Sequence, residues 1–393
     1  MPDGSPLPRF LVLYGALFAA FGVVAPFLPG LLLQDGLSPG GIGVVLAAGT
    51  ATRLLAGPLG GRLADRTGRA PLVLTGFIAI AAIVAMGYVP ARGLLLLLIV
   101  SVAHAAVLAP VVPIADALTL GSSGRKPRFE YGWVRAMGSA AFIAGALLSG
   151  SVVGWLGLGI VIWLNAGLLG VAAGLGWRIP NRVAGAAATL HESGSMRALL
   201  GIPVFRRLMV VAALIGGSHA LHDSFEVIRW RAAGLTAGQC SVLWASSVAA
   251  EIVVFLVLGR RLLHRLGPAH ALSLAALAGI VRWGVAAQTA WFPAMALVEP
   301  LHGLTFALLH LACLDLMGRV VPAALAATAQ AFYGTVAMGA AAAAVTLASG
   351  PLYEQFGPGA FWAMAALCAA ALPVASGLRV PPIGSGAARS SPG

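Results

Sequence analysis

The chain has 393 residues, of which 60% are hydrophobic and only 9% charged, and its mean hydropathy is +0.95. This apolar content exceeds what one soluble core can bury, so the composition excludes a soluble protein and indicates a polytopic membrane protein. The net charge of +12 comes from basic residues scattered between hydrophobic segments, so we expect them to orient the chain in a bilayer and expect no nucleic-acid partner.

Apolar segments of about 20 residues, enough for one bilayer crossing, recur along the whole chain. Polar, Gly and Pro clusters divide it into twelve predicted helices: 9–34, 38–60, 71–90, 93–120, 131–155, 158–178, 204–231, 238–262, 268–289, 291–318, 321–349 and 354–378. The first segment has no small-residue cleavage site, so we interpret it as an uncleaved span. The predicted fold class is an all-α membrane protein with twelve transmembrane helices.

Lys and Arg predict the orientation of these helices. With a cytoplasmic N-terminus, most Lys and Arg residues lie in cytoplasmic loops. On the outer side of the membrane there are only Arg92, Arg229 and Arg231. The positive-inside rule therefore favours a multi-pass protein of a bacterial inner membrane with both termini in the cytoplasm.

An internal repeat predicts two halves. The segment DGLSPGGIGVVL at 35–46 aligns with AGLTAGQCSVLW at 233–244, and in the same register Arg53 overlays Glu251. We expect two pseudo-symmetric six-helix bundles, at 1–178 and 204–393, joined by a cytoplasmic linker at 179–203, with a short cytoplasmic tail at the end. Such halves carry a binding site at their interface near the middle of the membrane.

The sequence GRLADRTGRA at 61–70 stands between the second and third predicted helices. Its glycines allow close approach, and its charges could form ion pairs that break as two bundles rock. The alternative is that these charges only orient a tight loop. The first interpretation predicts a gating loop formed by Gly61, Leu63, Asp65, Arg66, Gly68 and Arg69.

The seventh segment contains SHALHDSFEVIRW at 218–230, with four ionisable residues in eight positions: His219, His222, Asp223 and Glu226. On an α-helix these offsets fall on one stripe about 100° wide. We expect the stripe to face a water-filled cavity, except that an i,i+3 pair with Arg229 near the membrane interface explains Glu226 better. No HExxH or cysteine partner supports a metal site, so we expect no metal and no cofactor.

Other ionisable residues also fall at middle depth, where an unpaired charge costs several kcal/mol. They are Arg53, Glu251, Arg282 and His302. An apolar environment favours a neutral carboxyl and a nearby arginine favours a charged one, so Glu251 beside Arg53 or Arg282 is either a proton carrier or a structural ion pair. Asp116 is a further buried charge partner, for Arg135 or for Arg125 and Arg128.

The 61–70 loop resembles the Gly-x-Leu-Ala-Asp-Arg-x-Gly-Arg signature of the major facilitator superfamily, with Ala70 replacing the final basic residue and His264 at the equivalent aspartate position of the second half. The segments YGWVRAMGSAAF, EPLHGLTFALLHLA and ATAQAFYG are similar to the phenylpropionate permease family, which is related to lactose permease-type proton symporters.

This resemblance implies roles for particular residues. By resemblance Arg135 is implied to bind substrate, Arg282 and His302 to be tied to proton coupling, and Asp223 to belong to a charge pair. From the buried charges themselves we expect substrate to bind near Arg135, Asp223, Arg282 and His302, and protons to be coupled by Glu251, Asp223 and His302. One departure is Thr305, which stands where lactose permease has its proton-carrying carboxylate, so another acid must serve here.

These observations predict a secondary active transporter that takes up a small organic solute, such as an aromatic carboxylic acid, together with a proton. A sugar or nucleoside is the alternative substrate. Export by proton antiport is disfavoured, because VAHAAVLAPVVP at 102–113 lacks the basic signature of drug exporters. We expect no enzymatic activity, and as partners the solute, protons and lipid for a monomeric protein.

Overall fold

The computed structural model describes residues 5–123, 129–181 and 196–378, and within these ranges it contains helices and no β-strand. The helices before residue 181 are α1 (Leu7–Val24), α2 (Leu28–Gln34), α3 (Pro39–Thr67), α4 (Ala70–Met86), α5 (Gly93–Leu108), α6 (Val111–Ser123), α7 (Tyr131–Leu156) and α8 (Ile160–Gly176). We call them the N-terminal group.

The α-helices after residue 195 form the C-terminal group: α9 (Met196–Leu200), α10 (Pro203–Gly217), α11 (Val227–Ala232), α12 (Ala237–Val253), α13 (Gly259–Gln288), α14 (Phe292–Val298), α15 (Leu309–Val320), α16 (Ala326–Phe332), α17 (Ala341–Phe356) and α18 (Phe361–Ser376). Between them lie π-helical segments η1 (His222–Glu226), η2 (Val254–Leu258), η4 (Gly303–Leu308) and η6 (Tyr333–Ala340), and 3-10 turns η3 (Glu299–Leu301), η5 (Ala323–Leu325) and η7 (Gly357–Ala360).

Eight helical runs in the described residues are long and apolar enough to cross a membrane. Two of them, 237–288 and 323–376, are 52 and 54 residues long, and each covers two of the predicted segments. Each of these runs contains a glycine with positive φ, Gly267 at 72° and Gly357 at 52°, a conformation that favours glycine. Two shorter apolar helices are Ala70–Met86 and Ile160–Gly176.

Two predicted segments are interrupted near prolines. The segment 9–34 divides into α1 and α2 around Pro26, and 93–120 divides into α5 and α6 at Pro110. Proline has no N–H to donate to the preceding turn and its ring clashes with that turn, so a helix breaks there.

The predicted gating loop at 61–70 is mostly helical, so its prediction as a loop is wrong. α3 continues to Thr67, and Gly68, with φ of 62°, ends it. Leu63 and Ala64 favour helix continuation, and the surrounding charged side chains are exposed to solvent. Among the described residues, Asp65, Arg66 and Arg69 make no ion pair within 4.0 Å.

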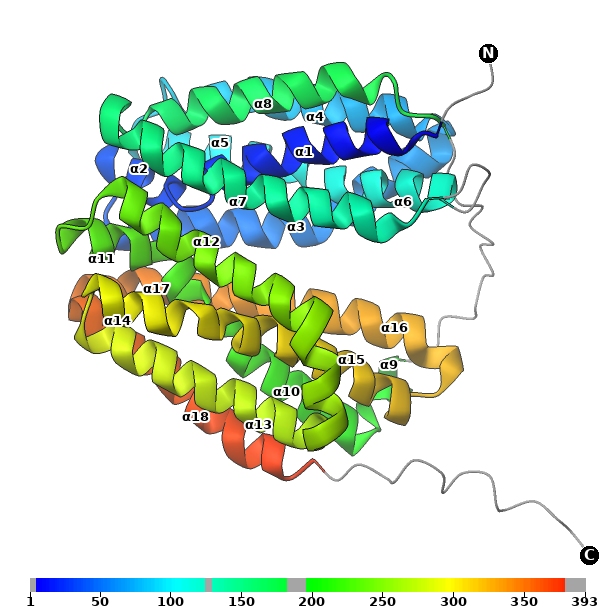
Figure 1. The fold of residues 1–393 in the computed structure, drawn as a ribbon, viewed down its shortest axis with the longest axis vertical. Helices are drawn as coiled ribbons and strands as arrows, with labels where there is room; N and C mark the ends of the chain where they lie inside the picture. The colour runs from blue at the N-terminus through cyan, green and yellow to red at the C-terminus, as the bar shows by residue number, and fades with distance from the viewer. Residues whose placement is uncertain (1–4, 124–128, 182–195, 379–393) are drawn as a thin grey trace, which may run out of the picture.

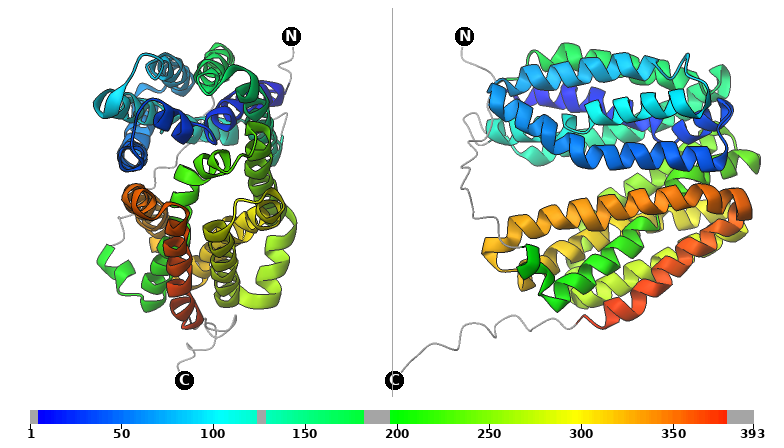
Figure 2. Two further views of the ribbon diagram at one scale, coloured as in Figure 1. Left: turned by 90° about the vertical axis from the view of Figure 1, so that its left-hand side faces the viewer. Right: turned by 180° about the vertical axis from the view of Figure 1, so that it is seen from behind.

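The two groups of helices lie one above the other (Figure 1), and the start of α1 and the end of α18 are at the same end of the molecule. Both groups are also distinct in the views of Figure 2. Most of the predicted linker (182–195), the tail from residue 379, and Arg125 and Arg128 lie outside the described residues.

The two groups contact each other at the opposite end, which we call the closed end. There α3 packs against α17 and α7 against α12. A Cβ on Gly350 of α17 would lie 2.6 Å from the Pro39 carbonyl oxygen, and one on Gly150 of α7 would overlap Ser241. The backbones therefore touch because these positions are glycine. Glu354 adds a polar contact, since its Oε2 accepts a hydrogen bond from the Gly40 N–H at 3.2 Å.

Candidate functional site

The charged stretch of the seventh predicted segment is not a regular α-helix. α10 ends at Gly217, and His222–Glu226 forms the π-helical segment η1. A π turn changes the angular position of successive side chains, and such turns are frequent at functional sites. The four residues of the predicted stripe therefore point to different surroundings.

Only part of the stripe faces a cavity. The Asp223 side chain is 58% exposed, and His219 and His222 line cavities although they are buried. Glu226 is fully buried, and its Oε1 lies 3.4 Å from Arg229 Nη1. Glu226 therefore does not share the cavity-facing stripe, and the i,i+3 pair with Arg229 that was preferred for it is confirmed.

Glu299 lies at the centre of a buried network. Its Oε2 accepts from Arg282 Nη2 at 2.7 Å and from Ser247 Oγ at 2.6 Å, and it lies 3.1 Å from His222 Nε2. Arg282 and Glu299 are both completely buried. Their ion pair is short and removed from water, so each charge depends on the other for its compensation.

His302 extends this network to Glu251. Arg282 Nη1 lies 3.1 Å from His302 Nδ1, and His302 Nε2 lies 3.5 Å from Glu251 Oε2. A guanidinium only donates, so Nδ1 must accept, which places the ring proton on Nε2, facing the Glu251 carboxylate. Glu251 therefore contacts His302, and the sequence-based pairing of Glu251 with Arg282 or Arg53 is wrong.

His222 joins the network to the cavity. Its Nδ1 lies 3.1 Å from Asp223 Oδ1, while its Nε2 lies within 3.1 Å of both Glu299 Oε2 and Arg282 Nη2. The ring stacks on Trp244, with centroids 5.2 Å apart and planes 21° apart. A neutral His222 accepts from Arg282, whereas a protonated one donates to Glu299, so this side chain can take either role.

Thr305, the position where a carboxylate was expected by resemblance, makes a local contact. Its Oγ1 lies 2.9 Å from His219 Nε2. His219 Nδ1 lies 3.2 Å from the Gly216 carbonyl oxygen, and its ring is edge-on to that of His302 at 5.2 Å. This hydroxyl positions His219 beside His302, and it cannot replace a carboxylate as a proton carrier.

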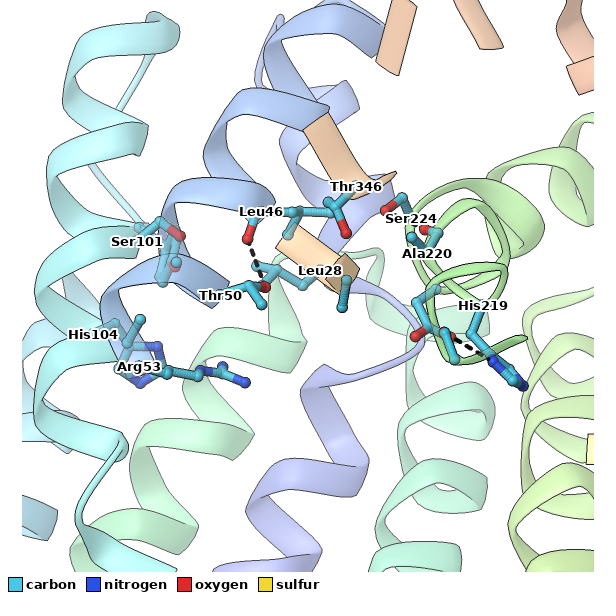
Figure 3. Close-up of a pocket in the computed structure, with 16 residues that line it drawn as sticks. Leu28, Leu46, Thr50, Arg53, Ser101, His104, His219, Ala220, Ser224 and Thr346 are labelled. Carbon is cyan, nitrogen blue, oxygen red and sulfur yellow. Dashed lines mark hydrogen bonds between the residues drawn. The ribbon is translucent and has the colours of Figure 1, made fainter. Parts of the chain in front are cut away.

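Three cavities that share lining residues lie between the two groups of helices, with volumes of about 320, 390 and 540 Å³. Asp223 lines all three. Their remaining walls come from both groups, with Arg53, His104 and Phe142 on one side and Trp244 and His302 on the other. Figure 3 shows the first cavity, where Arg53 and His104 lie across from His219 and Ser224.

Arg135 and Asp116 form a separate cluster within the N-terminal group. Arg135 Nη1 lies 3.7 Å from Asp116 Oδ1, the Tyr14 hydroxyl donates to the same oxygen, and the guanidinium lies over the Phe18 ring at 5.3 Å. Of the two partners considered for Asp116, the structure places Arg135 beside it. Arg135 does not line any of the three cavities.

Arg53 differs from its predicted role as a buried charge partner. Within residues 5–123, 129–181 and 196–378 it makes no ion pair within 4.0 Å, and its side chain is exposed in two of the cavities. Its guanidinium is therefore available to a ligand.

Sequence reasoning assigned no role to Glu299, Ser247 or His104, and it gave His222 no role beyond its place on the cavity-facing stripe. Two signals were present: Glu299 lies three residues before His302 on the same helical stripe, and His222 belongs to the charged stretch of the seventh segment. Ser247 carried no signal, because a serine in a membrane helix is common.

A bundle of apolar helices around a polar central cavity with buried ion pairs is the architecture of a membrane transporter. The MFS_1 like family model matches residues 8–364, so the chain belongs to the MFS_1 like family. It is a transporter with membrane-spanning helices and not an enzyme.

Relatives and solved structures agree with this assignment. The "Probable 3-phenylpropionic acid transporter" of Escherichia coli (strain K12) is 30% identical over 91% of this chain and 94% of the relative. The "Maltose permease" of Geobacillus stearothermophilus is 28% identical over 91% of each chain. The crystal structure of nucleoside transporter NupG superposes with a TM-score of 0.80 at 16% identity, covering 95% of this chain and 98% of that one.

Proposed function

We propose that this protein is a proton-coupled symporter of a bacterial inner membrane, which takes up a small organic solute such as an aromatic carboxylic acid by alternating access. The observation that supports this most is the continuity of the charged network. From Asp223 in the cavity it runs through His222 to Glu299, and from there through Arg282 to His302 and Glu251. Structural ion pairs alone do not need an opening to a solute-sized cavity.

In this proposal twelve helices cross the membrane as two six-helix bundles, 1–178 and 204–393, with both termini in the cytoplasm. The runs at 237–288 and 323–376 each count as two crossings that turn at Gly267 and Gly357. The shorter helices 70–86 and 160–176 add one crossing each. The closed end then faces outward, and the α3 terminus with Asp65, Arg66 and Arg69 faces the cytoplasm.

The proton route uses groups that can exchange partners. His222 contacts acids at both ring nitrogens, so proton transfer between Asp223 and Glu299 requires no large motion. At the other end His302 directs its Nε2 proton to Glu251. Protonation of Glu251 or Asp223 would remove a charge from the network and allow the loaded carrier to reorient. Arg282 and His302 hold this network in place beside the solute.

A sugar is the second candidate solute, supported by the 28% identity to a maltose permease over 91% of both chains. The two solutes need different surroundings: a carboxylate requires a cation with an apolar wall, and a sugar requires several hydrogen-bond partners around its rim.

The test is uptake into proteoliposomes with an acidic exterior and a neutral lumen, offering 3-phenylpropionate, maltose and uridine separately. Protein-free liposomes give the passive flux of each solute. We expect uphill accumulation of one solute by the wild type, and loss of that accumulation in Glu251→Gln with solute exchange retained. Glu130→Gln, at an exposed position before α7, is the matched control. Unchanged uphill accumulation in Glu251→Gln would remove this carboxylate from the mechanism.

A further inference from the structure

The N-terminal wall of the cavity carries a cation that forms no ion pair with any described residue. Arg53 is the central residue of α3 (Pro39–Thr67), and its exposed side chain lines the cavities of about 320 and 540 Å³. It makes no ion pair within 4.0 Å in the part of the chain that the structure describes. A guanidinium at this depth is stabilised by water or by a bound anion, because lipid chains and apolar side chains provide neither hydrogen-bond acceptors nor negative charge.

A second polar group on the same wall also has no partner. His104 of α5 is 8% exposed, and its buried Nε2 has no hydrogen-bond partner among the described residues. Its ring packs edge-on against Tyr88 at 5.8 Å, which holds its orientation. His104 lines the same two cavities as Arg53, and the two side chains lie together in Figure 3. An unsatisfied buried nitrogen destabilises the protein, and a hydrogen bond to a ligand oxygen can recover that loss.

The rest of the larger cavity is mainly apolar. Beside Arg53, His104 and Asp223, its walls include Phe21, Val24, Leu28, Leu46, Phe142 and Trp244. Its volume of about 540 Å³ is within the range of about 300–1,000 Å³ that is typical of small-molecule sites. Such a wall suits a hydrocarbon or aromatic group and offers few hydrogen bonds to the hydroxyls of a sugar.

We propose that Arg53 and His104 form the carboxylate subsite of the transporter, and that the apolar wall between Phe142 and Trp244 holds the ring or hydrocarbon body of a monocarboxylate. This inference rests on the proposed transport function and names the substrate class of that site. It assigns anion binding to Arg53 in place of Arg135, whose guanidinium already pairs with Asp116 at 3.7 Å. Arg53 can hold a carboxylate by two parallel hydrogen bonds, and His104 Nε2 can donate a third.

The experiment measures equilibrium binding to purified protein without any pH gradient, by titration calorimetry with 3-phenylpropionate, with its uncharged amide and with maltose. The variants are Arg53→Gln, Arg53→Lys and His104→Asn. Arg62→Gln is the matched control, because Arg62 is an exposed residue of the same helix without an ion pair in the structure's described ranges.

We expect the wild type and Arg62→Gln to bind the acid at least about tenfold more tightly than the amide. Arg53→Gln should weaken acid binding about 10- to 100-fold and leave amide binding nearly unchanged, since hydrogen bonds to charged groups contribute about 1.5–3 kcal/mol. Arg53→Lys should be intermediate because it keeps the charge without the planar fork. His104→Asn should weaken acid binding by about three- to tenfold, the loss of one hydrogen bond.

Wild-type affinity for the acid in folded Arg53→Gln overturns the subsite, and so does wild-type protein that binds maltose but no aromatic acid. If Arg53→Gln does not fold, Arg53→Lys decides: undiminished preference for acid over amide, together with unchanged binding in His104→Asn, also overturns it. Arg53-dependent binding without gradient-driven accumulation in proteoliposomes would instead refute proton coupling and leave the subsite standing.

Discussion

Arg282 and Glu299 form the most deeply buried ion pair of the network. Both side chains are 0% exposed, and Arg282 Nη2 lies 2.7 Å from Glu299 Oε2. Removing one partner of such a pair leaves the other charge uncompensated, at a cost of about 3–5 kcal/mol. The pair therefore constrains folding as well as transport.

At the residue scale we predict that Glu299→Gln lowers the thermal unfolding temperature of the purified protein by several degrees. The loss corresponds to about 3–5 kcal/mol of stability, whereas exposed Glu130→Gln should change it little. In the double variant Arg282→Met with Glu299→Gln, most of the lost stability should return, because no buried charge is left unpaired. A double variant less stable than Glu299→Gln alone would contradict this account of the pair.

Sequence reasoning located most of these residues but not all of their contacts. The cost of a charge at middle depth identified Arg282, His302 and Glu251, and the structure brings them together. Their pairing could not be predicted, because it depends on how α12, α13 and η3 pack against one another in space. Arg53 was interpreted as a charge partner of a nearby acid. The sequence alone cannot show that its side chain faces a cavity instead.

At the element scale, the closed end depends on backbone contact between α3 and α17. Gly43 and Gly350 allow this contact, because a Cβ on Gly43 would lie 3.0 Å from the Gly350 Cα. The Glu354 carboxylate accepting from Gly40 at the N-terminus of α3 is favoured by the helix dipole. Separation of the two groups at this end requires loss of both contacts.

We predict that Gly350→Val opens the closed end, because its side chain overlaps the Pro39 carbonyl region of α3. Leu46→Cys reports on the cavity, since the three native cysteines are buried. In right-side-out vesicles, a membrane-impermeant maleimide should label this cysteine at least about tenfold faster in the Gly350→Val background, with transport strongly reduced.

Gly154→Val is the control for this experiment, because a Cβ on Gly154 meets no atom within 4 Å and the residue lies near the same end of α7. Equal labelling rates in the Gly350→Val and Gly154→Val backgrounds would show that the α3–α17 contact does not hold this end closed.

Element boundaries were predictable where apolar runs meet turn residues, as at the positive-φ glycines Gly36 and Gly234 that precede α3 and α12. The boundary within GRLADRTGRA was not predictable, because its polar residues suggested a loop whereas the helix continues to Thr67. Charged side chains at a helix end can remain in solvent without ending the helix, so polarity alone did not identify the turn.

At the scale of the whole molecule, composition was sufficient to predict a helical membrane protein. The two pseudo-symmetric halves inferred from the internal repeat stay a prediction. The solute class could not be predicted from the residues alone. It depends on which side chains of α3, α5, α7, η1 and α12 line the cavity together. Arg135 illustrates the limit: its motif resembles a substrate-binding one, its Nη1 lies 3.7 Å from Asp116 Oδ1 within its own group of helices, and its substrate contact stays a prediction.

The central claim is that solute and proton move together through this cavity. Its most direct test uses proteoliposomes that contain a pH dye and have no imposed gradient, with 3-phenylpropionate added outside. We predict that wild-type protein acidifies the lumen faster than protein-free liposomes do, in proportion to solute entry. Asp223→Asn, which cannot exchange a proton at the cavity surface, should reduce this protein-dependent acidification at least about tenfold, whereas Asp315→Asn, in a half-buried ion pair with Arg319, should not. Protein-dependent solute entry with no accompanying proton entry would contradict the account.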